Sequence, residues 1–252
     1  MTLKPIGSQV IHLDTTDSTN MYASRLLGSG QARHGTVVRT AYQEKGRGQD
    51  QSTWFSDPGK NLLFSVVLSI ETFQAEKQFM INKIISLGIT DYLTGLSMDP
   101  GSHVSIKWPN DVYIGNKKAG GILIQNQIKG QTVSSSIIGI GLNINQDTFP
   151  DSLPNPVSIK QITGRSHDLE KSFTSLLDHL NGRMNQFLRG KEERIHRGYL
   201  RRLFQVNQRK KYKVPGRLIQ GTITGVDEFG RLIIVDEQGN TLTLNMKEVI
   251  FL

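Results

Sequence analysis

The sequence predicts an α/β protein of the α+β type, in which a mixed-sheet core is followed by a small all-β domain. Up to about residue 206, short apolar segments alternate with two longer stretches of helical periodicity. From Tyr212 to Leu252, apolar and polar residues alternate between closely spaced glycines. Short strands with turns this close together are typical of a β-barrel of about five strands. We therefore expect domains at 1–206 and 207–252.

Strands at 10–13 and 36–41 should flank a helix that Asp17 or Ser18 caps and that ends at Gly28. The next segment, 43–60, loses all periodicity and holds three glycines and a proline. A polar segment of this length inside a compact domain is usually functional or disordered.

Two stripes of apolar residues at helical spacing, 75–96 and 169–188, are long enough to cover a sheet, and the second pattern continues to Leu203. The remaining strands predicted for the core are 61–70, 104–108, 112–114, 121–125 and 133–142.

Composition excludes several kinds of protein. The chain of 252 residues contains no cysteine, which excludes disulfides and thiolate metal sites. No run approaches the ~20 apolar residues of a spanning helix, and the first residues lack the apolar core of a signal peptide. We therefore expect a cytoplasmic protein that does not contact a membrane.

The net charge is +8, from 30 Lys and Arg against 22 Asp and Glu. A basic surface attracts nucleotides, nucleic acids or acidic proteins. Much of the excess lies between Arg194 and Lys213, where few of the aromatic residues that a nucleic-acid platform uses are interleaved. This cluster predicts a solvated helix face that leads into a linker.

The segment Lys107-Trp108-Pro109-Asn110-Asp111 carries the strongest functional signal. Pro109 cannot continue a central strand, so a lysine, an amide and a carboxylate cluster at a strand end, where α/β enzymes tend to place their chemistry. Lys118 follows seven residues after Asp111, and Gly121 lets a ligand approach the backbone. This set suits a nucleotide and an anionic substrate. The alternative is a hairpin ended by proline, with its charges in water.

This segment resembles the signature of biotin protein ligases, which carry the same five residues and a lysine at the same offset. The resemblance extends over nearly the whole chain. It implies a mixed-sheet catalytic core of the class II synthetase-like biotin/lipoate ligase kind, with a C-terminal SH3-like β-barrel. It also implies that Lys107, Asn110 and Asp111 bind ATP, and that Lys118 and Gly121 contact biotin.

The start of the first predicted helix, Ser18-Thr19-Asn20, matches the family segment that holds the ureido ring of biotin. Free backbone amides and short polar side chains supply the donors and acceptors that a cyclic urea requires. The alternative is that these residues only cap the helix.

The loop residues Gln43, Arg47, Gly48 and Gln49 match a family loop that closes over biotin and the adenylate. Glycines beside an arginine free the backbone to wrap an anion. A mobile surface loop without a ligand is the alternative. The family usually places several arginines after this point, where Asp50 here introduces an anion.

Two further matches concern the nucleotide. Trp54 corresponds to a family tryptophan that stacks near adenine, although a tryptophan is as often a packing residue. Asn143, at the end of a predicted strand, corresponds to an asparagine of the nucleotide site, although turn chemistry would also explain it.

The resemblance implies ATP-dependent attachment of biotin to a lysine of a biotin carboxyl carrier protein of acetyl-CoA carboxylase or a related carboxylase. Lys118 would lie between the biotin carboxylate and the α-phosphate, and Arg47 would close the loop. Mg²⁺ would bridge the phosphates with help from Asp111, and no resident metal is expected. A homodimer is one possible assembly.

Two alternatives remain. A lipoate-type acyl ligase would share the core, but its Arg-x-x-Gly-Gly-Gly signature and downstream His-Asp pair have no match in the sequence. A biotin-binding regulatory module would carry a DNA-binding region before Ser18. Only seventeen residues precede Ser18, so no DNA binding is expected.

Overall fold

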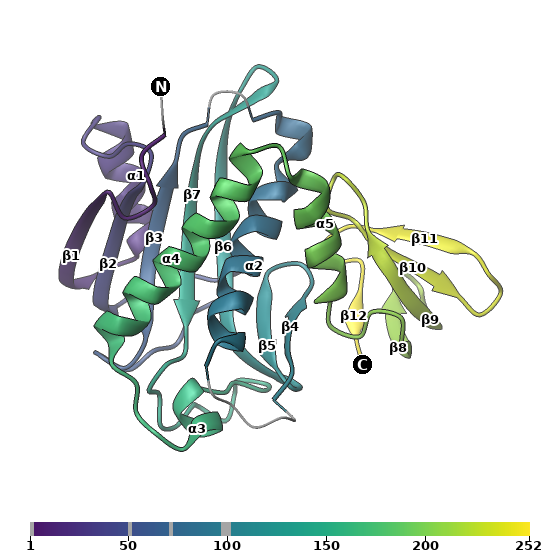
Figure 1. The fold of residues 1–252 in the computed structure, drawn as a ribbon. Coiled ribbons are helices and arrows are strands. Elements are labelled where there is room, and N and C mark those ends of the chain that lie inside the picture. The colour runs from purple at the N-terminus through teal and green to yellow at the C-terminus, as the bar shows by residue number, and fades with distance from the viewer. Residues whose placement is uncertain (1–2, 50–51, 71–72, 97–101) are drawn as a thin grey trace.

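The computed structural model describes residues 3–49, 52–70, 73–96 and 102–252. They form a seven-stranded sheet of order β1-β2-β3-β7-β6-β5-β4 and a five-stranded sheet of order β11-β10-β9-β8-β12 (Figure 1). Strands β1 and β2 pair in parallel, and every other pair is antiparallel. The mixed sheet and the small C-terminal sheet confirm the predicted fold class.

The core strands are β1 (Gln9–Thr16), β2 (Thr36–Gln43), β3 (Leu62–Leu68), β4 (Val104–Lys107), β5 (Asp111–Ile114), β6 (Lys117–Lys129) and β7 (Thr132–Leu142). The helices are α1 (Thr19–Gly28), the short 3₁₀ helix η2 (Ala75–Lys77), α2 (Phe79–Thr94), α3 (Ile159–Thr163), α4 (Leu169–Leu188) and α5 (Glu192–Arg201). The C-terminal strands are β8 (Arg209–Val214), β9 (Arg217–Val226), β10 (Leu232–Asp236), β11 (Thr241–Leu244) and β12 (Ile250–Phe251).

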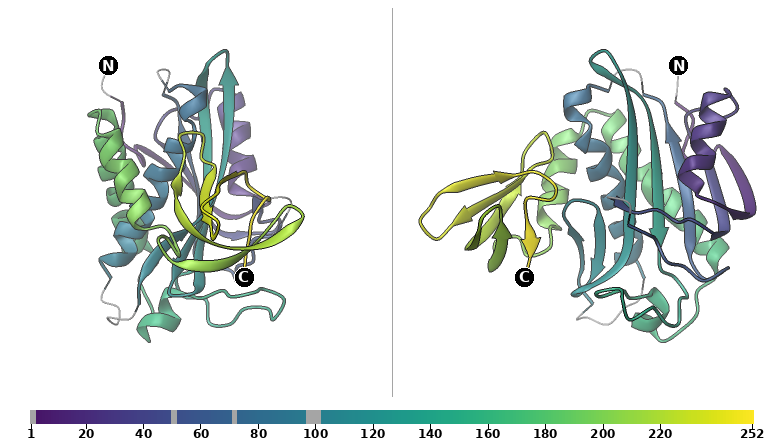
Figure 2. Two further views of the ribbon diagram at one scale, coloured as in Figure 1. Left: turned by 90° about the vertical axis from the view of Figure 1, so that its right-hand side faces the viewer. Right: turned by 180° about the vertical axis from the view of Figure 1, so that it is seen from behind.

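Helices cover one face of the large sheet and, over β2, β3 and β7, part of the other face (Figures 1 and 2). Helices α2 and α4 lie on one face, where α2 is buried along almost its whole length because it packs against both the sheet and the helices α4 and α5. Helix α1 lies on the other face and packs Ala23 against Val38, Val67 and Ile137. Strand β3 is buried throughout, as predicted for an apolar strand in the middle of a covered sheet.

The chain between the two sheets lies along the outer strand β4. The Ile106 amide donates a hydrogen bond of 2.7 Å to the Arg202 carbonyl, and the Phe204 amide donates one of 2.9 Å to the Ile106 carbonyl. The linker therefore supplies β4 with backbone partners on its free side.

The structure corrects two details of the prediction. The stripe at 75–96 is not one helix, because Ala75–Lys77 is a 3₁₀ helix and α2 begins at Phe79. Helix α3 is not predicted by periodicity, since it has only five residues. A capping box, in which Ser158 and Gln161 bond each other's backbone amides, fixes its start.

The turn Gly115-Asn116 joins β5 to β6.

No helix in the described part of the chain has the length and apolar character needed to cross a membrane.

Candidate active site

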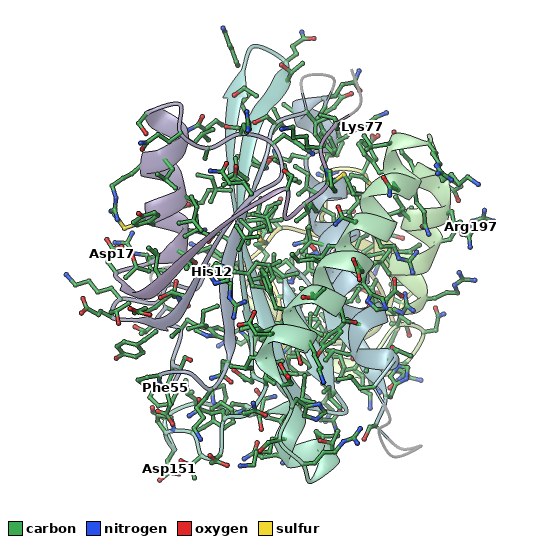
Figure 3. The ribbon with its side chains drawn as sticks, turned by 60° about the vertical axis from the view of Figure 1, so that its left-hand side comes forward. His12, Asp17, Phe55, Lys77, Asp151 and Arg197 are labelled. Carbon is green, nitrogen blue, oxygen red and sulfur yellow. The ribbon has the colours of Figure 1, made fainter. Side chains whose placement is uncertain are left out.

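A cavity of about 230 Å³ lies where the start of α1 and the ends of β2, β5, β6 and β7 meet the loop after β2. Figure 3 shows the side of the molecule that holds α1, with Asp17 labelled beside that helix. The residues that line the cavity are Ser18, Thr19, Asn20, Gln43, Arg47, Gly48, Gln49, Ser52, Thr53, Trp54, Asn110, Asp111, Lys118, Gly121, Ile122, Leu123, Gly139, Ile140 and Gly141. They include 12 of the 14 site residues that the sequence predicts.

The start of α1 forms a buried polar end of this cavity. The Thr19 amide donates to Gln43 Oε1 at 2.8 Å, which ties α1 to the end of β2. Ser65 Oγ, from β3, lies 2.7 Å from Thr19 Oγ1 and 2.6 Å from Asn20 Oδ1. Asn20 Nδ2 donates to the Leu123 carbonyl at 3.2 Å. Each side chain is therefore held in one orientation before a ligand arrives.

Ser18 occupies the N-cap position of α1, but its side chain makes no capping hydrogen bond. Instead, the carboxylate of Asp17 accepts the Ser18 amide at 2.7 Å. A hydrogen bond from Arg25 is the main cause that lowers the pKa of the Asp17 carboxyl. The capping alternative therefore does not account for the Ser18 hydroxyl, and Ser18 as a whole is only 2% exposed at the cavity wall.

Two charged side chains face each other across the cavity wall. Lys118 Nζ lies 2.7 Å from Asp111 Oδ1, and both side chains remain partly exposed to solvent. The backbone of Lys118 is fixed on both sides, because its amide donates to the Asn155 carbonyl and its carbonyl accepts from the Val157 amide. Asn110 Nδ2 donates to the Ile122 carbonyl at 2.6 Å, which holds the turn before Asp111 against β6.

The indole of Trp54 lies over a pair of glycines. Gly121 of β6 and Gly141 of β7 are directly opposite each other in the sheet. A Cβ atom on Gly141 would lie 2.5 Å from Trp54 Cε2, and one on Gly121 would lie 3.1 Å from Trp54 Cζ3. The ring therefore requires glycine beneath it. Trp54 Nε1 is buried and has no hydrogen-bond partner among the described residues.

The loop that carries Arg47 is partly ordered by its own backbone. The Gly48 amide donates to the Ser52 carbonyl at 2.7 Å, and the Trp54 amide donates to the Gly46 carbonyl at 3.0 Å. These bonds place Arg47 and Gly48 at the mouth of the cavity. Asp50 lies outside the described residues.

Lys107 and Asn143, both predicted to bind ATP, do not line this cavity. Lys107 Nζ donates to the Tyr113 hydroxyl at 3.2 Å, on the side of the C-terminal sheet. Asn143 is 3% exposed, and its Nδ2 donates to the Val157 carbonyl at 3.1 Å. It therefore helps to hold the segment at 155–157, which bonds the Lys118 backbone. For these two residues, the structure offers no contact with the cavity.

Several residues of the wall are not among the predicted site residues: Ser52, Thr53, Ile122, Leu123, Gly139, Ile140 and Gly141. The alternation of Gly139 and Gly141 along β7 is a usable signal, because both glycines face the cavity. A Cβ atom on Gly139 would lie 2.5 Å from Asn20 Oδ1.

Within the described ranges, no group of three or more His, Asp or Glu side chains could hold a metal ion. Asp111 is the one carboxylate among the described residues of the wall. A single carboxylate suits Mg²⁺ that arrives on phosphates, since this ion keeps water and phosphate oxygens as most of its ligands.

Comparison with known proteins agrees with this geometry. The sequence pattern of the biotin/lipoate A/B protein ligase family matches residues 13–143, which contain the whole cavity wall. The chain belongs to this family.

The individual relatives of the chain agree with this family assignment. The chain is 33% identical over 166 residues to the bifunctional ligase/repressor BirA of Bacillus spizizenii, and this match covers 65% of the chain and 50% of BirA. It is 30% identical over 169 residues to the biotin–[acetyl-CoA-carboxylase] ligase of Paracoccus denitrificans, covering 66% of the chain and 68% of that ligase. The chain thus spans about half the length of the first of these relatives.

Among solved structures, the biotin protein ligase from Aquifex aeolicus in complex with biotin and ATP superimposes with a TM-score of 0.78. The two proteins are 25% identical, and the match covers 96% of this chain and 98% of the Aquifex chain. The second sheet is thus part of the shared fold.

Proposed function

We propose that this protein activates biotin with ATP to biotinyl-5′-adenylate and then transfers the biotinyl group to a lysine of a carrier protein. The observation that carries the proposal is the convergence, on one cavity, of a buried polar end and a lysine–carboxylate pair. The first suits a neutral ring rich in hydrogen-bonding groups, and the second suits reacting anions. The names of the two relatives and the ligands of the Aquifex structure support the same reaction.

In the first step, an oxygen of the biotin carboxylate attacks the α-phosphorus of ATP. The bond from that phosphorus to the bridging oxygen breaks, and pyrophosphate leaves. Both reactants are anions, so a fixed cation between them lowers the barrier. Lys118 is suited to this role because its backbone is held rigidly while its ammonium group is partly exposed. An incoming carboxylate or phosphate can share Lys118 with Asp111 at small cost, since partly exposed ion pairs contribute little.

The polar end would orient the biotin head. Ser18, Thr19 and Asn20 offer hydroxyl and amide groups to the ligand. Gln43 holds Thr19 in place by accepting a hydrogen bond from its backbone amide. Such positioning supplies much of the rate in a reaction that needs no covalent enzyme intermediate. We assign Arg47, Gly48, Gln49 and Gly121, which also line the cavity, to the same ligand.

Trp54, Asn110 and Asp111 are the proposed nucleotide residues. The Trp54 indole lines the cavity and suits an adenine ring, and its Nε1 has no hydrogen-bond partner among the described residues. Asp111 would contact Mg²⁺ that enters as part of the substrate ATP-Mg. Lys107 and Asn143 remain predicted nucleotide residues without a contact in the cavity.

In the second step, the amine of the acceptor lysine attacks the carbonyl carbon of the adenylate, loses a proton and displaces AMP. The acceptor is proposed to be the biotin carboxyl carrier protein of acetyl-CoA carboxylase or a related carboxylase. We also propose that residues 207–252 form a separate C-terminal domain. An enzyme that uses ATP in this way is proposed to work in the cytoplasm.

A direct test combines the purified chain with biotin, ATP-Mg and a carrier domain, and then measures the mass of the carrier. We expect the addition of one biotinyl group, dependent on ATP. The control is Lys118→Ala, which should leave the carrier unchanged. A folded wild-type protein that adds nothing to the carrier and releases no pyrophosphate from ATP and biotin would overturn the proposal.

A further inference from the structure

Two neighbouring residues of the segment at 107–111 face the C-terminal sheet. Lys107 Nζ lies 5.0 Å from the centre of the Phe251 ring and 5.1 Å from that of Tyr113. Both distances are typical of a cation over an aromatic ring. Trp108 is 4% exposed, and its Nε1 donates a buried hydrogen bond of 2.8 Å to the Gly230 carbonyl. The segment therefore holds the C-terminal sheet at two separate places, β12 and the β9–β10 turn.

The last two residues of the same segment, Asn110 and Asp111, line the cavity. A single turn between β4 and β5 thus contacts the C-terminal sheet with one half and the reaction site with the other. Figure 1 shows this arrangement, with the β4–β5 hairpin at the edge of the large sheet, next to β12.

The C-terminal part of the chain also reaches the loop at 44–49, which lines the cavity. Gln49 Nε2 lies 3.6 Å from Met246 Sδ, in the segment between β11 and β12. A second cavity of about 820 Å³ lies between these two segments, and Arg47 and Gly48 line it as well as the first cavity. The position of Met246 relative to this loop depends on how the C-terminal sheet is seated on the core.

We propose that Lys107 and Trp108 are positioning residues. They seat the C-terminal sheet on the catalytic core, and Met246 passes that placement on to the loop at 44–49. The cation–aromatic contact of Lys107 and the buried indole hydrogen bond of Trp108 hold the same rigid sheet. Weakening either contact therefore increases the mobility of the loop at 44–49. The effect of this arrangement on the reaction rests on the proposed function, whereas the arrangement itself does not.

The two tryptophans of the chain allow a measurement without any ligand, because each indole N–H gives its own NMR signal. The variants are Lys107→Met, Phe251→Leu and the two combined, and the matched control is Lys129→Met, an exposed lysine at the far end of β6. We expect each single variant to speed hydrogen exchange of the Trp108 indole by about tenfold. The double variant should have less effect than the sum of the single variants, because both substitutions remove the Lys107–Phe251 contact.

The same samples report on the loop through the Gly48 amide, which bonds the Ser52 carbonyl. Its exchange should rise in Lys107→Met and in Phe251→Leu. Met246→Ala should raise Gly48 exchange and leave the Trp108 indole at the wild-type rate. Unchanged Trp108 exchange in both single variants would overturn the seating role. Faster Trp108 exchange with unchanged Gly48 exchange would overturn the transmission to the loop.

Activity then separates this role from direct ATP binding. A positioning role predicts that Lys107→Met and Phe251→Leu raise the KM for ATP-Mg by similar factors. A rise confined to Lys107→Met would show instead that Lys107 is a nucleotide ligand, and would overturn the proposal. If the chain has no ligase activity at all, the exchange results still decide the seating role.

Discussion

Lys118 Nζ lies 2.7 Å from Asp111 Oδ1, so the lysine at the centre of the cavity is already paired with an anion before any substrate arrives. A lysine held in this way keeps its position. It can exchange one anionic partner for another without moving its backbone, which the segment at 155–157 fixes.

Replacing Lys118 with alanine should abolish adenylate formation and leave the fold intact. The side chain is partly exposed, so the free energy of unfolding should change by about 1 kcal/mol or less. Pyrophosphate release from ATP and biotin measures the first, and urea denaturation the second. Lys117→Ala is the matched control, because that neighbouring lysine is exposed and lies outside the cavity wall. Normal pyrophosphate release by folded Lys118→Ala would remove Lys118 from the mechanism.

Asp111→Asn should separate the two substrates. Without the carboxylate, ATP-Mg should bind about tenfold more weakly, because Mg²⁺ would lose its proposed protein ligand. Biotin alone should bind at least as well as to the wild type, since Lys118 no longer has an anionic partner. Calorimetric titrations with each ligand in turn test this difference. Equal loss of both affinities would indicate general damage to the site.

Gly141→Ala should displace the indole of Trp54, because the new methyl group would lie 2.5 Å from Trp54 Cε2. We expect a loss of about 1–3 kcal/mol of stability from the crowding, together with weaker ATP-Mg binding. Gly182→Ala is the control: Gly182 is exposed in the middle of α4, and its Cβ would contact nothing. That variant should gain about 0.5–1 kcal/mol and keep its ATP affinity. An unaltered ATP affinity in Gly141→Ala would argue against a nucleotide role for Trp54.

The loop at 44–49 and 52–60 should become more protected from hydrogen exchange when biotinyl-adenylate binds. Only some of its amides, such as those of Gly48 and Trp54, have backbone partners without ligand. The slowing should be greatest at the amides without such partners, and amides of β3 provide the internal reference. Identical exchange with and without the adenylate would show that the loop is not a lid.

Lys83 should make stability depend on alkaline pH. Burial lowers the pKa of this side chain from 10.5 to about 8, and its Nζ lies 3.0 Å from His196 Nδ1. Burial and the Lys83 charge also lower the pKa of His196. Between pH 8 and 10.5 the unfolded chain therefore binds more protons than the folded one, and the free energy of unfolding rises with pH.

The comparison of wild type with Lys83→Met isolates this effect, because other titrating groups cancel. From about pH 7.5 to about pH 10, the wild type should gain up to about 3 kcal/mol relative to the variant. Urea denaturation at the two pH values measures the gain. A difference between the proteins that does not change with pH would show that the Lys83 pKa is ordinary.

The sequence predicts those parts of the fold that have a strong period. Helix α4 occupies the predicted residues 169–188, and β7 and β3 differ from their predicted bounds by only a few residues. Helix α3 cannot be predicted from periodicity, because one and a half turns are too short to show a helical period. Its Ser158-x-x-Gln161 spacing is a start signal that a search for capping boxes would find.

The site is predictable where the motif residues sit on strand ends, and less so where tertiary packing sets the direction of a side chain. Asn110 and Asp111 face the cavity as predicted from the turn. Lys107 points toward Phe251, a residue 144 positions later in the chain, and no local pattern reveals that contact. The same holds for Trp54, whose place depends on glycines of two distant strands.

The pairing of β4 with the linker has a consequence for the solubility of shortened forms of this protein. A chain that ended before Arg202 would leave the backbone groups of Ile106 without partners, on a strand at the rim of the large sheet. An exposed edge strand with unpaired backbone groups pairs with strands of other molecules. Ending the chain after Gln208 keeps the linker in place. Of two truncations that both remove the C-terminal sheet, the shorter chain should therefore aggregate, and the longer one should stay dispersed.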